Sequence, residues 1–424
     1  MSSDVERLLD APDSITTSEG QTTSKSVNGK KGIWENIYLY KMPQLTQEQL
    51  VGFSTKYKYS AIDTSPLSKY VMHPLWNWGV TFFPTWVAPN VMTFAGYICL
   101  LIDYCLLAHY DWSFSAENSS EQPNIPRWVW FVVAVLHAAS HHLDGMDGKQ
   151  ARRTGSGSPL GELMDHGIDS NCMWMLPVTL MSVFGSNPAA GGIAMQYSPL
   201  LMLALTFNFW VNHWEKYNTG VLYLPWMFDI AQTTVVVVFL AAGFLTPGGL
   251  KNFFADNICP FNQLIYIMIP IGFVGAIGLT ILNLRLSYQS GTNRHNSICE
   301  MMRPWVSYVI FNFLSLTFPL FCREDFMSNP RVWTIAYGFT FSNIVCRLMI
   351  NQMSYTRCEL IEPPLVPLFI SWFIAVVLRI SPSTVIMVYA IVAMVSFVHY
   401  CYVVVNDLCD HLNICAFSIT SKRR

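Results

Sequence analysis

Charged residues are scarce in this sequence. Only 12% of its 424 residues are Asp, Glu, Lys or Arg, whereas soluble domains usually carry roughly 25%. This composition excludes a disordered chain and an ordinary cytosolic enzyme, because both need far more charge. The net charge of -2 and the lack of a basic cluster give no reason to expect a nucleic acid partner.

Paired cysteines and a signal peptide are also missing. The eleven cysteines are scattered, without a Cys-x-x-Cys pair or metal-ligand spacing, so we interpret them as packing residues. Residues 1–44 are rich in Ser, Thr, Gly, Asp and Lys, begin without an apolar run, and predict a disordered cytosolic tail.

Apolar residues are abundant and make up 52% of the chain. They fall in runs of about 20 residues, which is the length of a helix that crosses a bilayer. We therefore expect an all-α, polytopic membrane protein with about ten transmembrane helices. The predicted ranges are 88–108, 128–143, 161–184, 193–211, 228–245, 264–284, 305–321, 332–350, 365–378 and 385–405.

An amphipathic segment, 45–87, precedes the first of these runs. Its residues Trp76, Trp78 and Trp86 lie among Lys and His, which is typical of helices in the headgroup layer of a membrane. A soluble cap is the alternative. Most Lys and Arg residues between the apolar runs fall on the cytosolic side if the N-terminus is cytosolic, which favours that orientation.

One stretch, 141–170, interrupts the apolar pattern. It holds four aspartates at the cytosolic ends of the second and third predicted helices: Asp144, Asp147, Asp165 and Asp169. Carboxylates at the edge of the hydrocarbon layer are expensive and usually functional. At about 100° per residue, the first pair lies on one helix face and the second pair on one face of the next helix.

Two such helices facing each other would gather four carboxylates around one point. Oxygen-rich sites of this kind hold Mg²⁺ or Mn²⁺. Two ions about 3.5–4 Å apart would balance the negative charge and could bridge a diphosphate. The alternative, small residues packing two helices whose ends are capped by aspartates, does not explain four aspartates.

Small and basic residues accompany the aspartates, and all of them except Lys149 lie on the same helix faces. Gly148, Ala151 and Gly161 leave room for a substrate to approach the backbone. Lys149 and Arg152 can contact phosphate oxygens. These residues predict that the site binds a phosphorylated substrate beside the metal ions.

The pattern D-x-x-D-G-x-x-A-R-x8-G-x-x-x-D-x-x-x-D is complete from Asp144 to Asp169. It resembles the signature of the CDP-alcohol phosphotransferase family. Flanking segments such as DGKQARRT, PLGELMDHG and HWEKYNTGVLYLPW are similar to eukaryotic amino-alcohol phosphotransferases, those for ethanolamine above all. We expect a catalytic region at 88–246, further transmembrane helices at 247–408 and a cytosolic tail at 409–424.

The resemblance implies a reaction. Phosphoethanolamine would pass from CDP-ethanolamine to diacylglycerol, giving phosphatidylethanolamine and CMP, at a site that faces the cytosol. The resemblance also implies an endoplasmic reticulum or Golgi membrane, contact with membrane lipid, and a homodimer. Three alternatives stay open: a choline or dual specificity, a prenyltransferase, and a transporter or receptor with a structural cation site.

A base must take the proton of the lipid hydroxyl. Asp169 is often proposed for this fold, but a carboxylate that binds Mg²⁺ is a poor base. His166 lies next to Asp165, and histidine is suited to proton transfer near neutral pH. We expect His166 to be the base and Asp169 to be chiefly a metal ligand, with a supporting role for His166 as the alternative.

Substrate contacts outside the motif are less well defined by the sequence. Asn90, in the Pro89-Asn90-x-x-Thr93 opening of the first helix, occupies a family position that implies contact with the nucleotide or a metal-bound phosphate; helix capping is the alternative. Asp229 or Glu215 could accept hydrogen bonds from an ethanolamine ammonium group, whereas choline favours an aromatic cage. The sequence leaves this specificity open.

Overall fold

The computed structural model describes residues 44–63, 65–115, 125–224 and 227–419. The predicted tail, 1–44, lies outside the described residues except for its last position. The described part is almost wholly helical, as the composition predicts. Its strands are one short parallel pair, β1 (Ala61–Asp63) and β2 (Leu222–Leu224).

Each of the ten predicted apolar ranges overlaps a helix. These helices are α3 (Pro89–Tyr110), α4 (Arg127–Thr154), α5 (Pro159–Phe184), α6 (Ser198–Thr219), α7 (Met227–Asn257), α8 (Phe261–Gln289), α9 (Ile298–Phe321), α11 (Pro330–Ser354), α12 (Leu365–Trp372) and α13 (Pro382–Leu412). Among the described residues, five helices are long and apolar enough to cross a membrane, namely α3, α7, α8, α9 and α13.

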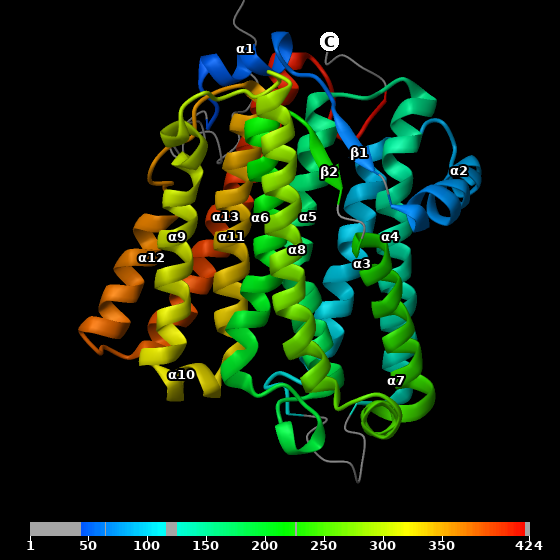
Figure 1. Ribbon diagram of the computed structural model, residues 1–424, viewed down its shortest axis with the longest axis vertical. Coiled ribbons are helices and arrows are strands. Elements are labelled where there is room, and N and C mark those ends of the chain that lie inside the picture. Colours follow the sequence, from blue (N-terminus) through cyan, green and yellow to red (C-terminus); the bar gives the residue numbers. More distant parts are fainter. Residues whose placement is uncertain (1–43, 64, 116–124, 225–226, 420–424) are drawn as a thin grey trace, which may run out of the picture. The chain divides into compact units, whose positions relative to one another are not determined.

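The long helices run alongside one another, with α1 (Gln47–Thr55) and the strand pair at one end and α10 (Arg323–Ser328) at the other (Figure 1). α6 begins at Ser198 rather than at the predicted 193. Two short 3₁₀ turns, Pro188–Ala190 and Met195–Tyr197, occupy the segment before it. Glycines at 191 and 192 explain the late start, because glycine favours turns over helix.

A tight reversal joins α4 to α5 and positions the acidic motif. α4 ends where Gly155 takes a left-handed conformation, with φ 64°, which glycine adopts without strain. Ser158 then caps α5: its hydroxyl oxygen accepts the backbone N–H of Gly161 at 3.1 Å. Both helices pack against α3, so the end of α4 and the start of α5 flank the same region.

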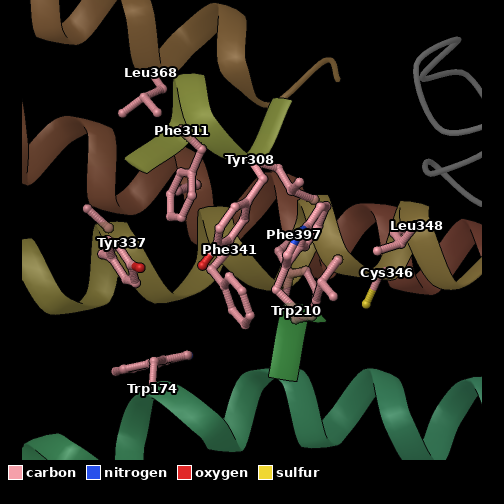
Figure 2. Packing of buried hydrophobic residues seen from close by; sticks show 14 of the residues in the cluster. Trp174, Trp210, Tyr308, Phe311, Tyr337, Phe341, Cys346, Leu348, Leu368 and Phe397 are labelled. Carbon is pink, nitrogen blue, oxygen red and sulfur yellow. The ribbon is translucent and has the colours of Figure 1, made fainter. Parts of the chain in front are cut away.

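Aromatic side chains fill the space between α5, α6, α9, α11 and α13, as Figure 2 shows. Trp210 of α6 stacks on Tyr308 of α9, with ring centroids 4.5 Å apart. Trp174 of α5 lies against α11, where Gly338 leaves the room for its indole ring. This core holds α5 in a fixed position and thereby fixes half of the acidic motif.

Replacing Gly338 by alanine should destabilise the protein by about 1–3 kcal/mol, because overpacking a close-packed core forces neighbours to move. A Cβ at this position would lie 2.2 Å from Cδ2 of Trp174. Thermal unfolding of the detergent-solubilised protein tests this prediction. Gly272→Ala on α8 is the matched control, since its Cβ would meet nothing within 4 Å. Equal melting temperatures for the two variants would contradict the prediction.

The segment before α3 forms short helices rather than one long one. α2 (His73–Gly79) follows a π-helical turn, Ser68–Met72. Trp78 and Trp86 are 62% and 78% exposed, whereas Trp76 is only 7% exposed and packs inside the protein. Its ring fills the slot that Gly145 leaves on α4, where a Cβ would lie 2.2 Å from Cε2 of Trp76.

Candidate functional site

The four aspartates of the motif meet between α4 and α5. Asp144, Asp147 and Asp165 offer oxygen atoms that lie within 4.8 Å of one another. Asp165, His166 and Asp169 form a second group with the same spacing. The carboxylates thus converge as two overlapping groups that share Asp165.

Such a cluster is chemically suited to divalent cations. Like charges this close repel one another strongly, so the cluster needs positive charge or protons to persist. Carboxylate oxygens are the ligands that Mg²⁺ and Mn²⁺ prefer. The donor set of the four aspartates therefore fits a metal centre.

Thr93 of α3 orients one of these carboxylates. Its hydroxyl donates a hydrogen bond to Oδ2 of Asp147, and both side chains are buried. This bond leaves the other oxygen of Asp147 for a metal ion. Thr93 was part of the opening motif of α3 in the sequence, but the sequence assigned it no role.

His166 lies between two carboxylates on its own helix. Its Nδ1 is 3.8 Å from Oδ2 of Asp169, one turn ahead, and its Nε2 is 4.0 Å from Oε1 of Glu162, one turn behind. The ring of His213, on α6, lies edge-on at 5.5 Å between centroids. The side chain of His166 is 14% exposed, so it is accessible from the site but held on several sides.

Glu162 is a buried residue of the site that sequence reasoning missed. Its carboxylate accepts hydrogen bonds from Lys216 of α6 and from the hydroxyl of Tyr57. Burial and the charge of Glu162 raise the pKa of Tyr57, so its hydroxyl stays protonated and can donate. An acidic residue in the first turn of a helix is usually explained by its favourable interaction with the helix dipole. The sequence therefore offered no reason to place Glu162 in the site.

The small and basic residues of the motif divide into two groups. Arg152 is exposed, and its Nη1 would lie 3.8 Å from a Cβ placed on Gly148, which is an ordinary van der Waals contact. Ala151 is half-buried one turn after Gly148 on the same helix. Lys149 instead contacts α2, with its Nζ 3.5 Å from Nδ1 of His73. Arg152 is thus exposed at the end of α4, whereas the ammonium group of Lys149 faces α2.

Asn90 connects the site to the end of the chain. Its side-chain amide donates to the backbone carbonyl of Ala416 at 2.7 Å, and its Oδ1 would lie 3.6 Å from a Cβ on Gly161. Phe417 packs on Phe94 with ring centroids 5.9 Å apart. The residues after α13 thus lie across the first turn of α3, within the segment predicted as a tail.

A cavity opens beside the carboxylates, among α3, α4, α5 and α7. Asp144 and Asp169 form part of its wall, and further polar lining comes from Thr93, Ser140 and His141. Apolar lining comes from Leu100, Ile168, Met173 and Phe228. A cavity with charged and apolar parts suits an amphipathic ligand.

The two candidate acceptors for an ammonium group lie in different places. Asp229 of α7 is 2.9 Å from Nε2 of His141, which lines the cavity, and it also accepts the hydroxyl of Ser68. Glu215 accepts a hydrogen bond from Asn283 of α8 at 2.8 Å and is not part of the cavity wall. Of the two, Asp229 is the one beside the site.

Comparison with known proteins gives consistent matches. A sequence model of the family described as CDP-alcohol phosphatidyltransferase matches residues 86–269. Ethanolaminephosphotransferase 1 of Mus musculus is 39% identical over 381 residues, which cover 88% of this chain and 94% of that protein. Its Homo sapiens counterpart is 38% identical over 379 residues, with the same coverage. Cholinephosphotransferase 1 of Xenopus laevis is 27% identical over 399 residues, or 91% and 93% of the two chains.

Proposed function

The chain belongs to the CDP-alcohol phosphatidyltransferase family, and from that premise we propose that it transfers phosphoethanolamine from CDP-ethanolamine to diacylglycerol, releasing CMP and phosphatidylethanolamine. The observation that carries the proposal is the pair of overlapping acidic groups beside an amphipathic cavity. The higher identity to an ethanolaminephosphotransferase than to a cholinephosphotransferase supports ethanolamine as the headgroup.

Four aspartates would hold two Mg²⁺ or Mn²⁺ ions. Asp144, Asp147 and Asp165 would bind one ion, and Asp165 with Asp169 the other. Bound there, the ions would offset the charge of the diphosphate and stabilise CMP as it leaves. Thr93 supports this arrangement because its hydrogen bond holds Asp147 in place.

Neighbouring residues would bind the nucleotide half of the substrate. Arg152 would contact the phosphates, with Gly148 and Ala151 leaving space beside it. Asn90, next to Gly161, would contact the nucleotide through its side-chain Oδ1, because its hydrogen bond to Ala416 uses only the amide nitrogen. We do not assign a phosphate contact to Lys149, since its ammonium group lies on α2.

His166 would act as the base. Its Nδ1 faces Asp169 on the cavity wall and would accept the proton of the diacylglycerol hydroxyl as that oxygen attacks the phosphorus. Glu162, on the side of Nε2, would stabilise the imidazolium that forms. Lys216 and Tyr57 keep Glu162 fixed for this purpose.

The same proposal places the protein in a membrane. We propose that all ten helices cross it, that 45–87 lies in the headgroup layer, and that 88–246 is the catalytic region, with additional helices at 247–408. The exposure of Trp78 and Trp86 supports the interfacial assignment. A cytosolic site in the endoplasmic reticulum or Golgi, and a homodimer, stay predictions.

CMP release by the purified protein in lipid, with diacylglycerol and Mg²⁺ or Mn²⁺, tests the function. We expect CDP-ethanolamine to be used at least about tenfold better than CDP-choline, because a quaternary ammonium lacks the N–H donors that an acceptor such as Asp229 would bind. Equal use of both would indicate the dual specificity. Absence of CMP with every CDP-alcohol would contradict the proposal and favour a transporter.

A further inference from the structure

The residues that follow α13 form an ordered turn. Asn413 ends the helix in a left-handed conformation, with φ 54°, and the backbone N–H of Ile414 donates to a carbonyl in the last turn of the helix at 3.1 Å. Cys415 and Ser418 then pair as an antiparallel bridge, so the chain reverses between them. We call residues 413–418 the C-terminal turn, and backbone hydrogen bonds define its shape.

Two contacts attach the C-terminal turn to the start of α3. The backbone carbonyl of Ala416 accepts a hydrogen bond from Nδ2 of Asn90 at 2.7 Å. The ring of Phe417 packs on that of Phe94, with centroids 5.9 Å apart and the planes inclined by 65°. Asn90 and Phe94 lie four residues apart on α3, which places them one turn apart on one face of that helix. The C-terminal turn is therefore held against a single face of α3, near the N-terminal end of the helix.

The hydrogen bond fixes the orientation of the Asn90 amide. A backbone carbonyl can only accept, so the side chain must direct its nitrogen toward Ala416. Its oxygen Oδ1 consequently lies on the side of α5, where it would be 3.6 Å from a Cβ placed on Gly161. Asn90 is 9% exposed, and no described residue donates a hydrogen bond to Oδ1. The C-terminal turn thus leaves a nearly buried acceptor for a ligand.

This acceptor borders the proposed nucleotide site through both helices. On α3, Thr93 lies about one turn after Asn90 and donates a hydrogen bond to Asp147. On α5, Gly161 precedes Asp165 by four residues, which is again about one turn. A nucleotide whose phosphates lie beside these aspartates carries N–H and O–H donors, on its base and its ribose, from which Oδ1 can accept.

We propose that the C-terminal turn is a positioning element for the nucleotide: through Ala416 it holds the Asn90 amide with its oxygen toward the substrate, and so raises the affinity for CDP-ethanolamine. This inference rests on the proposed function. Without this contact the amide is free to rotate and to present either nitrogen or oxygen, and substrate binding must then order it. Phe417 acts through Ala416, since its contact with Phe94 keeps the neighbouring carbonyl within reach of Asn90.

Two truncated variants test this role. One ends at Asn413 and lacks most of the C-terminal turn, whereas its matched control ends at Ile419, so that the two differ only by residues 414–419. We expect the shorter variant to raise KM for CDP-ethanolamine about tenfold, with kcat changed less than about twofold, because the acidic groups and His166 remain. Affinity for CMP in the presence of Mn²⁺, measured by calorimetry, should fall by the same factor. The longer variant should match the wild type.

A double-mutant cycle separates positioning from a general structural effect. Asn90→Ala should raise KM at least as much as the shorter truncation does. Combining the two changes should raise KM no further than Asn90→Ala alone, because the C-terminal turn acts through this side chain. Additive effects would overturn the inference, since they would show that the turn acts independently of Asn90.

Phe417→Ala in the full-length chain covers the case in which the shorter variant fails to fold. It should raise KM about threefold, whereas Phe417→Leu keeps an apolar contact with Phe94 and should stay closer to the wild type. Phe313→Ala is the control, because that ring is 60% exposed on α9. An unchanged KM in a folded truncated or Phe417→Ala variant would overturn the inference alone. No CMP from any CDP-alcohol with the wild type would overturn the proposed function and this inference with it.

Discussion

Replacing Asp165 with asparagine should reduce the rate of CMP release by at least about a thousandfold. Asp165 is the only aspartate common to both acidic groups in the described structure, so its loss would weaken both proposed metal positions. Charge stabilisation by such ions contributes several kcal/mol to the transition state, and each 1.36 kcal/mol is about a factor of ten in rate. Steady-state turnover at saturating CDP-ethanolamine measures the effect.

Direct binding of Mn²⁺ separates loss of the metal from loss of the fold. Asp165→Asn should bind fewer Mn²⁺ ions than the wild type while its thermal unfolding stays cooperative. Asp256→Asn is the matched control, because Asp256 is exposed on α7 outside both acidic groups. If Asp165→Asn kept more than about a tenth of the activity, the assignment of this residue to both ions would be wrong.

Replacing His166 with glutamine should lower turnover at least about a hundredfold, since general-base catalysis typically contributes 10²–10⁴. Glutamine retains hydrogen-bonding groups but cannot accept the proton of the lipid hydroxyl. Its KM for CDP-ethanolamine and its binding of Mn²⁺ should change little, because the four aspartates stay in place. Turnover measured at saturating CDP-ethanolamine distinguishes a slower chemical step from weaker binding of this substrate.

His109→Gln supplies the control for this variant. His109 is exposed in the last turn of α3, far along the helix from Thr93, and should behave as the wild type. Near-normal turnover in His166→Gln would exclude His166 as the base. Asp169 would then be the candidate, despite its proposed role as a metal ligand.

Local periodicity predicted the central geometry of the site. Asp144 and Asp147 share a face of one helix, and Asp165 and Asp169 share a face of the next, because both spacings match the helical repeat. The short reversal between the helices then brings the two faces to one region. These features depend on neighbouring residues only, so the sequence was sufficient to predict them.

Contacts between segments that are far apart in the chain could not be predicted from the sequence. The position of the Glu162 carboxylate depends on hydrogen bonds from Tyr57, 105 residues earlier, and from Lys216, 54 residues later. The contact between His137 and Gln232 joins residues 95 apart. None of these pairs has a spacing that a helix or strand would bring together, so only the packing of α4, α6 and α7 reveals them.

The hydrogen bond between Asn90 and Ala416 also affects the order in which the site can assemble during translation. It joins residues that are 326 positions apart, although both contribute to one small region. At about 5–20 residues per second, a ribosome that has finished Asp169 needs roughly 12–50 s more to reach Ala416. A nascent chain therefore carries every proposed metal ligand long before it has the segment that lies across the start of α3. This wall of the site can form only after residues near Ala416 have been translated.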